Sequence, residues 1–364
     1  MNVSSSIENL LLDILTSIAS GTSPTLSIPK NDLNTEFSSL LGHYVLRDDS
    51  DFAFKTVSLS KRSGIHKFDV LMRTLSFVYD LLQNKKHASK RYFVLSTTTH
   101  NRELFYGDPD LYKDQRVSDE AIMDISRLLR VPRDHLNVFA EAKGIVAGDL
   151  VLWNGQTAVN CATSTFGLPI LPFTKNISDL RSEGLKWIIV VEKDAALYRL
   201  LEDDIRSKIG PCILITGCGF PDFATRSFLN IVAQTFSTVP VVGLVDADPY
   251  GLDILCTYRF GNAASAFETD LCVPRIKWLG VTAQDIASYD VSESALLPLT
   301  AADKKRGTNM IQRDCWDAAP QWKEQLEIMI DSGFKAEIQA LMSIDMEFLV
   351  NTYIPHKLEN RLFI

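Results

Sequence analysis

Trp187-Ile-Ile-Val-Val-Glu192 and Val239-Pro-Val-Val-Gly-Leu-Val-Asp-Ala-Asp248 set the architecture of the second half of this 364-residue chain. Each stretch begins as an apolar, β-branched run, which is typical of a strand buried on both faces of a parallel sheet. Each ends in carboxylates, Glu192 in the first and Asp246 and Asp248 in the second. Side chains two residues apart on an extended chain point the same way, so the two aspartates face together.

The sequence between these strands predicts a βαβαβ order. We expect helices over about 195–204 and 225–236, a strand over 211–216, a glycine-rich turn at 217–219 and a further helix from Gly251. Ligands of such sheets collect at the carboxyl ends of neighbouring strands, and right-handed crossovers bring those ends to one edge. Few hard oxygen ligands with room for water and phosphate favour Mg²⁺, with Mn²⁺ as a substitute. The alternative is that these carboxylates are ordinary turn and helix-capping residues.

Residues 185–275 resemble the toprim domain shared by topoisomerases and primases, which has one Glu after its first strand and Asp-x-Asp after a later one. The matching residues are Glu192, Asp246 and Asp248. The resemblance implies that these three hold a divalent metal for phosphodiester chemistry.

A second motif, Arg102-Glu-Leu-Phe-Tyr106, lies upstream and is followed by a helical pattern over 118–130. It is similar to the catalytic winged-helix (CAP-like) domain in the A subunit of topoisomerase VI and in its eukaryotic relative, the meiotic DNA double-strand-break protein. The resemblance implies that Tyr106 is the nucleophile and that Arg102 stabilises the phenolate or clamps the phosphate. Tyr92 lies in a fainter copy of the motif and is the second candidate. Further matching blocks lie at 141–148, 191–195, 216–222, 244–251, 278–280 and 335–341.

Three positions depart from the family pattern. Phe105 stands where many relatives have Tyr, which leaves Tyr106 as the attacking ring of that pair. Asn101 and Cys218 stand where the family often has Lys. The first of these replacements implies that one phosphate contact is absent.

The resemblance implies a mixed α/β protein that makes meiotic DNA double-strand breaks by transesterification. The break leaves a 5′-phosphotyrosyl link and initiates homologous recombination. The implied active form is a homodimer with composite active sites on double-stranded DNA, assisted in the nucleus by a B-subunit-like transducer and other meiotic accessory proteins. The chain has no Walker-type phosphate loop, so any ATP dependence belongs to a partner. Two alternatives stay open: the A subunit of a type IIB, ATP-dependent topoisomerase, and a DNA-binding scaffold without catalysis.

The charge is distributed unevenly along the chain. The net charge is −8, yet residues 55–143 contain 16 Lys and Arg against 11 Asp and Glu. Lys90, Arg91 and Lys143 in this stretch, together with Lys193 further along, are candidates for phosphate contacts, although for any single one of them a solvated surface is the better reading. The six cysteines show no Cys-x-x-Cys spacing, which predicts that they are reduced residues of the core. The sequence shows neither an apolar run of membrane-spanning length nor a secretion signal.

Three regions are expected from these patterns. Residues 1–50 contain an amphipathic helix near 7–15, which either packs on its own domain or docks a partner, and a linker over 20–29. Residues 51–150 form the winged-helix domain, with a helix over 68–82. Residues 151–364 form the toprim domain and a C-terminal extension with a predicted helix over 322–342.

Overall fold

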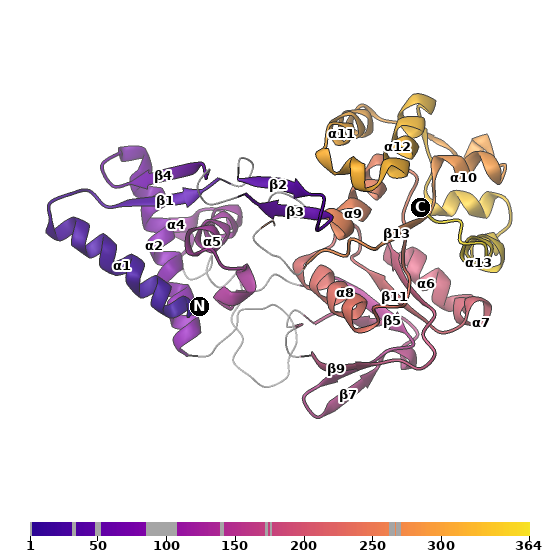
Figure 1. Cartoon of the computed structure of the whole chain (residues 1–364), viewed down its shortest axis with the longest axis horizontal. Helices are drawn as coiled ribbons and strands as arrows, with labels where there is room; N and C mark the ends of the chain where they lie inside the picture. Colours follow the sequence, from indigo (N-terminus) through magenta and orange to yellow (C-terminus); the bar gives the residue numbers. More distant parts are fainter. Residues whose placement is uncertain are drawn as a thin grey trace. The chain divides into compact units, whose positions relative to one another are not determined.

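The computed structural model describes residues 2–30, 34–47, 52–84, 108–138, 142–171, 174, 177–261, 266 and 271–364. The chain divides into two units. The first comprises residues 1–36, 44–141 and 262–269, and the second comprises residues 37–43, 142–261 and 270–364. Figure 1 traces both units along the chain.

The first unit is built mainly from helices packed with a two-stranded antiparallel sheet. The predicted helices at 68–82 and 118–130 are confirmed. The first begins at Arg62, six residues earlier than expected. Buried side chains such as Leu71, Val78 and Ile125 recur at helical spacing and form its core. Its elements are α1 (Val3–Ala19), β1 (Thr25–Pro29), β4 (Phe54–Ser58), α2 (Arg62–Gln83), α4 (Pro109–Tyr112), α5 (Gln115–Leu129) and η2 (Arg133–Leu136).

The N-terminal helix α1 packs on its own unit. Its residues Val3, Ile7 and Ile14 are buried in the same core as α2 and α5. Leu12 and Leu15 remain exposed, at 59% and 60% of their surfaces. Packing on its own domain is therefore confirmed, while docking of a partner on the exposed side stays a prediction.

The predicted linker over 20–29 is wrong for its second half. Strand β1 occupies Thr25–Pro29 and pairs antiparallel with β4 along its whole length. Leu26 and Ile28 alternate with exposed residues and are each 1% exposed. This alternation is the signature of a strand with one buried face, and it outweighs the turn-forming residues around it.

The second unit is organised by a six-stranded sheet with the strand order β13-β12-β10-β11-β5-β8. β10 pairs parallel with both β11 and β12, as the apolar runs predict, and Val191 lies opposite Leu244. The mixed α/β class with a parallel core is thus confirmed. The strands are β5 (Ile145–Gly148), β8 (Leu168–Pro169), β10 (Trp187–Val191), β11 (Cys212–Thr216), β12 (Val241–Leu244) and β13 (Lys277–Gly280).

Helices connect the parallel strands in the expected order. α6 and α7 lie between β10 and β11, α8 lies between β11 and β12, and α9 leads away from β12. Their bounds are α6 (Asp194–Glu202), α7 (Ile205–Ile209), α8 (Phe223–Thr235) and α9 (Pro249–Phe260). The remaining small strands are β2 (Thr35–Ser38) and β3 (His43–Leu46), which pair with each other, and β6 (Val151–Asn154), β7 (Thr157–Asn160) and β9 (Ile177–Arg181), which form a three-stranded sheet.

The predicted helix over 322–342 is too long. α12 (Pro320–Ser332) ends at Gly333, whose φ of +74° is a left-handed conformation that stops a helix. The short strand β15 (Phe334–Lys335) and the 3₁₀ helix η9 (Ile338–Ser343) follow it. The other elements of this end of the chain, drawn in orange and yellow in Figure 1, are α10 (Ala283–Ser288), η7 (Glu293–Ala295), β14 (Leu297–Pro298), α11 (Ala301–Ile311), η8 (Asp314–Ala318), η10 (Leu349–Tyr353) and α13 (Ile354–Glu359).

Five of the six cysteines are buried, as predicted for core residues, and Cys218 is partly exposed. Across the described ranges given above, no helix is both long and apolar enough to cross a bilayer.

Candidate metal centre

Glu192 and Asp246 meet because their strands are parallel neighbours. The backbone N–H of Glu192 donates to the carbonyl of Leu244 at 3.0 Å, which continues the ladder of β10 and β12 past their ends. The backbone N–H of Asp246 then donates to Glu192 Oε2 at 2.8 Å. Both carboxylates are buried, at 7% and 4% exposure. The predicted convergence at the carboxyl edge of the sheet is therefore present.

Asp248 caps the helix that follows. Its Oδ1 accepts the backbone N–H of Gly251 at 2.7 Å, and Pro249 occupies the first turn of α9. A Cβ on Gly251 would lie 2.5 Å from the carbonyl oxygen of Asp246 and 2.9 Å from Glu192 Oε2. Glycine at this position is what lets the turn close over the other two carboxylates.

Burial and neighbouring negative charge both disfavour the ionised form of the carboxyl groups in this cluster. Burial, and then the negative charge of Asp246, raise the pKa of Glu192 to about 7. Burial also raises the pKa of Asp248, against the hydrogen bond from Gly251, and the charge of Asp246 adds to the increase. Carboxyl groups that hold their protons this strongly are stabilised as anions when a cation binds between them.

Lys193 supplies one cation to the cluster. Its Nζ lies 2.7 Å from Asp246 Oδ2 and 3.5 Å from Glu337 Oε1. Lys193 was predicted as a DNA contact, and it lies directly at the carboxylate cluster. Its ammonium neutralises Asp246 in the present arrangement.

A segment far along the chain completes the centre. Ala247 and Ala336 exchange backbone hydrogen bonds of 2.8 and 3.2 Å in an antiparallel bridge, and the N–H of Ile338 donates to Asp246 Oδ1 at 2.9 Å. In this register Lys335 is opposite Asp248 and Glu337 is opposite Asp246. Sequence reasoning missed both residues. The only signal for them was the family-like block at 335–341.

The donor set fits a hard divalent cation. All three predicted ligands are carboxylates, the hard oxygen donors that Mg²⁺ prefers, and the negative charge of Asp246 adds to the effect of burial in raising the pKa values of Glu192 and Asp248. Within the described part of the chain, however, no group of three His, Cys, Asp or Glu is arranged to enclose a metal ion. In this arrangement Asp246 uses both oxygens, one to accept from Ile338 N–H and one to pair with Lys193.

Lys143 lies beside the glycine-rich turn at the end of β11. Its Nζ donates to the carbonyl of Cys218 at 3.2 Å, and its backbone N–H donates to Asp222 Oδ2 at 2.7 Å. The same turn is tied to the first strand, because the N–H of Gly219 donates to the carbonyl of Glu192 at 2.8 Å. Lys143 therefore lies at the same edge of the sheet as the carboxylates.

The other predicted site residues lie outside the described residues. These are Arg102, Tyr106, Lys90 and Arg91, together with the second tyrosine candidate, Tyr92. Their roles stay predictions.

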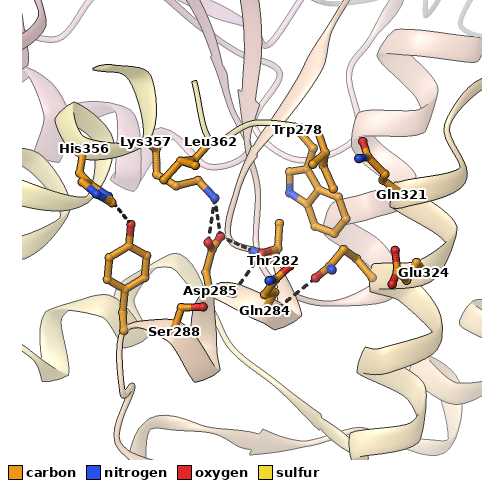
Figure 2. A pocket seen from close by; sticks show the side chains of 13 residues that line it. Trp278, Thr282, Gln284, Asp285, Ser288, Gln321, Glu324, His356, Lys357 and Leu362 are labelled. Atoms are coloured by element: carbon orange, nitrogen blue, oxygen red, sulfur yellow. Dashed lines mark hydrogen bonds and ion pairs between the residues drawn. The ribbon is translucent and has the colours of Figure 1, made fainter. Parts of the chain in front are cut away.

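A cavity of about 410 Å³ in the same unit is separate from this centre, since none of the three carboxylates lines it. Figure 2 shows the Lys357 side chain pointing at Asp285 among the residues that line the cavity. The Tyr289 hydroxyl lies 2.8 Å from His356 Nδ1 and joins two further lining residues. Lys357 Nζ lies 2.7 Å from Asp285 Oδ1, and Tyr353 Oη donates to Asp285 Oδ2 at 2.7 Å. The buried ion pair is thus satisfied within the protein and links α10 to α13.

Two family models match the chain. The model for the toprim domain of Spo11 and of the A subunit of topoisomerase 6 matches residues 187–358, and the model for type IIB DNA topoisomerase matches residues 66–138. The first match includes Glu192, Asp246 and Asp248. Toprim domains generally bind metal.

Curated relatives are similar over nearly the whole chain. The human meiotic recombination protein SPO11 is 36% identical over 98% of this chain and 87% of its own length. The mouse protein of the same name is 34% identical over 98% and 87%. The A subunit of DNA topoisomerase 6 from Arabidopsis thaliana is 34% identical over 99% of this chain and 81% of its own length.

Proposed function

The chain belongs to the family formed by Spo11 and the A subunit of topoisomerase 6, and from this premise we propose that it makes DNA double-strand breaks that start meiotic recombination. The reaction is a transesterification at a DNA phosphate. The observation that carries the proposal is the convergence of Glu192 and Asp246 at the ends of the neighbouring parallel strands β10 and β12, with Asp248 at the start of the helix that follows.

In the proposed step, the phenolic oxygen of Tyr106 attacks phosphorus and loses its proton. The P–O3′ bond breaks, the 3′ oxygen leaves as a hydroxyl after taking up a proton, and a 5′-phosphotyrosyl ester remains. One phosphodiester replaces another, so cutting needs no external energy source. Arg102 favours the reaction by stabilising the phenolate or the negative charge that develops on the phosphate.

Glu192, Asp246 and Asp248 would hold Mg²⁺, or Mn²⁺ in its place. When bound, such an ion polarises a phosphate oxygen and lowers the nucleophile strength that the reaction requires. Lys193 neutralises Asp246 until then, and we propose that it turns to a DNA phosphate in the complex. Lys143 is the second proposed phosphate contact from this edge of the sheet, and Lys90 and Arg91 are proposed contacts from the first unit.

The proposed assembly is a homodimer in the nucleus. In it the tyrosine of one protomer works with the metal centre of its partner, so that two chains cut both strands. A B-subunit-like transducer and other meiotic accessory proteins would assist. For the chain itself we propose residues 1–50 as the N-terminal part, 51–150 as a winged-helix domain with the catalytic tyrosine, and 151–364 as the toprim domain with its C-terminal extension.

A second candidate function is the A subunit of a type IIB topoisomerase. The similarity to the Arabidopsis protein, which spans 99% of this chain, favours it. ATP-dependent relaxation of supercoiled DNA with a B subunit would support this function, whereas breaks that are not resealed would support the first.

A trapping assay tests the main proposal. The protein, with its partners, is incubated with end-labelled DNA and Mg²⁺ or Mn²⁺ and then denatured. A covalent protein–DNA adduct that requires the metal and is lost in Glu192→Gln supports transesterification. DNA binding without any adduct would favour a scaffold.

A further inference from the structure

Lys335 is brought to the metal centre by the backbone register. The Ala247–Ala336 bridge is antiparallel, so the residue before Ala336 lies opposite the residue after Ala247. That pair is Lys335 and Asp248. Side chains opposite one another in such a register project to the same face, which points the Lys335 side chain toward the acidic turn.

A buried carboxylate fixes the Lys335 ammonium. Its Nζ lies 2.8 Å from Asp303 Oδ2, and Asp303 is 2% exposed. The same oxygen of Asp303 also accepts the N–H and the hydroxyl of Thr300, each at 2.8 Å. Asp303 is thereby anchored at the start of α11, and it holds one of the three donor positions of the ammonium. The Lys335 side chain keeps 19% of its surface exposed, so it is not sealed from solvent.

The charges near the Asp246–Asp248 turn determine whether a DNA phosphate can approach the Lys335 ammonium. Two ammonium groups, those of Lys193 and Lys335, stand among carboxylates that outnumber them. Asp303 and Glu337 belong to this set in addition to the three candidate metal ligands. A DNA phosphate would be repelled from this cluster until a divalent metal is bound, and would then meet Lys335 as a fixed positive charge.

We propose that Lys335 is a phosphate-binding residue of the DNA-cleavage site, donating from its Asp303-fixed ammonium to a non-bridging oxygen of the DNA backbone next to the metal centre. The proposal rests on the function proposed above, because it takes this centre as the place where DNA is cut. It adds a phosphate contact that neither the acidic motif nor the basic stretch of the first unit contains.

The salt dependence of DNA binding tests this contact. Each phosphate that a protein neutralises contributes about 0.9 to the slope of log Kd against log salt concentration. We would measure this slope for the full chain in Mg²⁺, in a Tyr106→Phe background that keeps binding at equilibrium. Lys335→Met should lower the slope by about 0.9, and Lys335→Arg should keep it. Lys323→Met is the matched control, because the Lys323 side chain on α12 is 39% exposed and pairs only with Glu327 among described residues.

A second variant distinguishes phosphate binding by Lys335 from a purely structural role of this residue. Lys335→Met alone leaves the buried Asp303 without its ammonium partner, whereas Lys335→Met with Asp303→Asn removes both charges and keeps an acceptor for Thr300. The proposal expects the lowered slope in both variants. An unchanged slope in the folded double variant would overturn it.

The two proposals fail in different ways. A Lys335-dependent slope in a protein that never forms a covalent adduct would overturn the cleavage function and leave the phosphate contact standing. Adduct formation with a salt-dependence slope that does not depend on Lys335 would overturn the phosphate contact and leave the cleavage function standing.

Discussion

The backbone N–H of Asp246 donates to Glu192 Oε2 at 2.8 Å, although 54 residues separate the two along the chain. This bond joins the ends of two parallel strands and fixes the distance between the first and second acidic groups. The carboxylates are therefore held by the sheet itself, and their crowding is built into the fold.

Loss of one carboxylate should remove metal binding. Glu192→Gln keeps an acceptor for the Asp246 N–H but lacks the charge, so we expect Mn²⁺ affinity to fall by at least about 100-fold. Isothermal titration calorimetry on the purified chain measures this without any need for activity. Asp179→Asn, a change in an exposed ion pair with Arg181, is the control. Equal affinities for Glu192→Gln and the wild type would place the metal elsewhere.

Lys193 should compete with the metal for Asp246. Removal of its ammonium by Lys193→Met takes away a positive charge 2.7 Å from Asp246 Oδ2. A unit charge near 4 Å is worth about 1 kcal/mol even with the screening of water, so Mn²⁺ should bind at least about fivefold more tightly in the absence of DNA. DNA binding should weaken in the same variant. Weaker Mn²⁺ binding would show that Lys193 supports the metal site.

The free energy of unfolding of the metal-free protein should fall as the pH rises from about 4.5 to 7. The pKa of Glu192 is raised from 4.5 to about 7 in the folded state, chiefly by burial. The folded state therefore binds more protons than the unfolded state in this window, and stability is lost as that proton leaves. The loss is about 3 kcal/mol, at about 1.4 kcal/mol per tenfold change.

Urea denaturation in EDTA at several pH values measures this effect. The Glu192→Gln variant should lack this part of the pH dependence, and added Mg²⁺ should restore stability to the wild type at pH 7. Identical pH profiles for the two proteins would contradict the raised pKa.

Gly251→Ala should disturb the centre without removing any ligand. The added Cβ would lie 2.5 Å from the Asp246 carbonyl oxygen, so the turn has to shift. We expect a loss of about 1–3 kcal/mol in the free energy of unfolding, together with weaker Mn²⁺ binding. Normal metal affinity in this variant would mean that the close approach of Gly251 to Glu192 is unimportant for the site.

Removal of one partner of the Asp285–Lys357 ion pair should destabilise the fold. Their side chains are 8% and 6% exposed, and Lys357→Met would leave Asp285 buried without its cation. Breaking such a pair costs about 3–5 kcal/mol. Thermal and urea unfolding would show it, with Lys323→Met staying within about 0.5 kcal/mol of the wild type.

The parts of the fold with an unambiguous local pattern could be predicted from the sequence. β10 was predicted to the residue, because a continuous apolar run of this length is typical of a strand buried on both faces. The end of α12 was missed, because a single glycine with positive φ overrides the helical pattern around it. The strand at Thr25–Pro29 was missed, because turn-forming residues surround a short alternation of two buried side chains.

The carboxylate cluster could be predicted because strand order brings the ends of β10 and β12 together. The approach of Lys335 and Ile338 could not, since they lie about 90 residues beyond the acidic turn and meet it only through tertiary packing. No local pattern marks such a contact. Only the assembled backbone shows that a lysine and a glutamate from another element face the two aspartates.

The cleavage function is tested most directly by identifying the residue that carries DNA after trapping. Wild-type protein with its partners, DNA and Mn²⁺ is denatured, digested with nuclease and protease, and the nucleotide-linked peptide is sequenced by mass spectrometry. We predict a 5′-phosphate ester on Tyr106, absent from Tyr106→Phe and from Glu192→Gln. An adduct on Tyr92, or no adduct under conditions where DNA is demonstrably bound, would contradict this prediction.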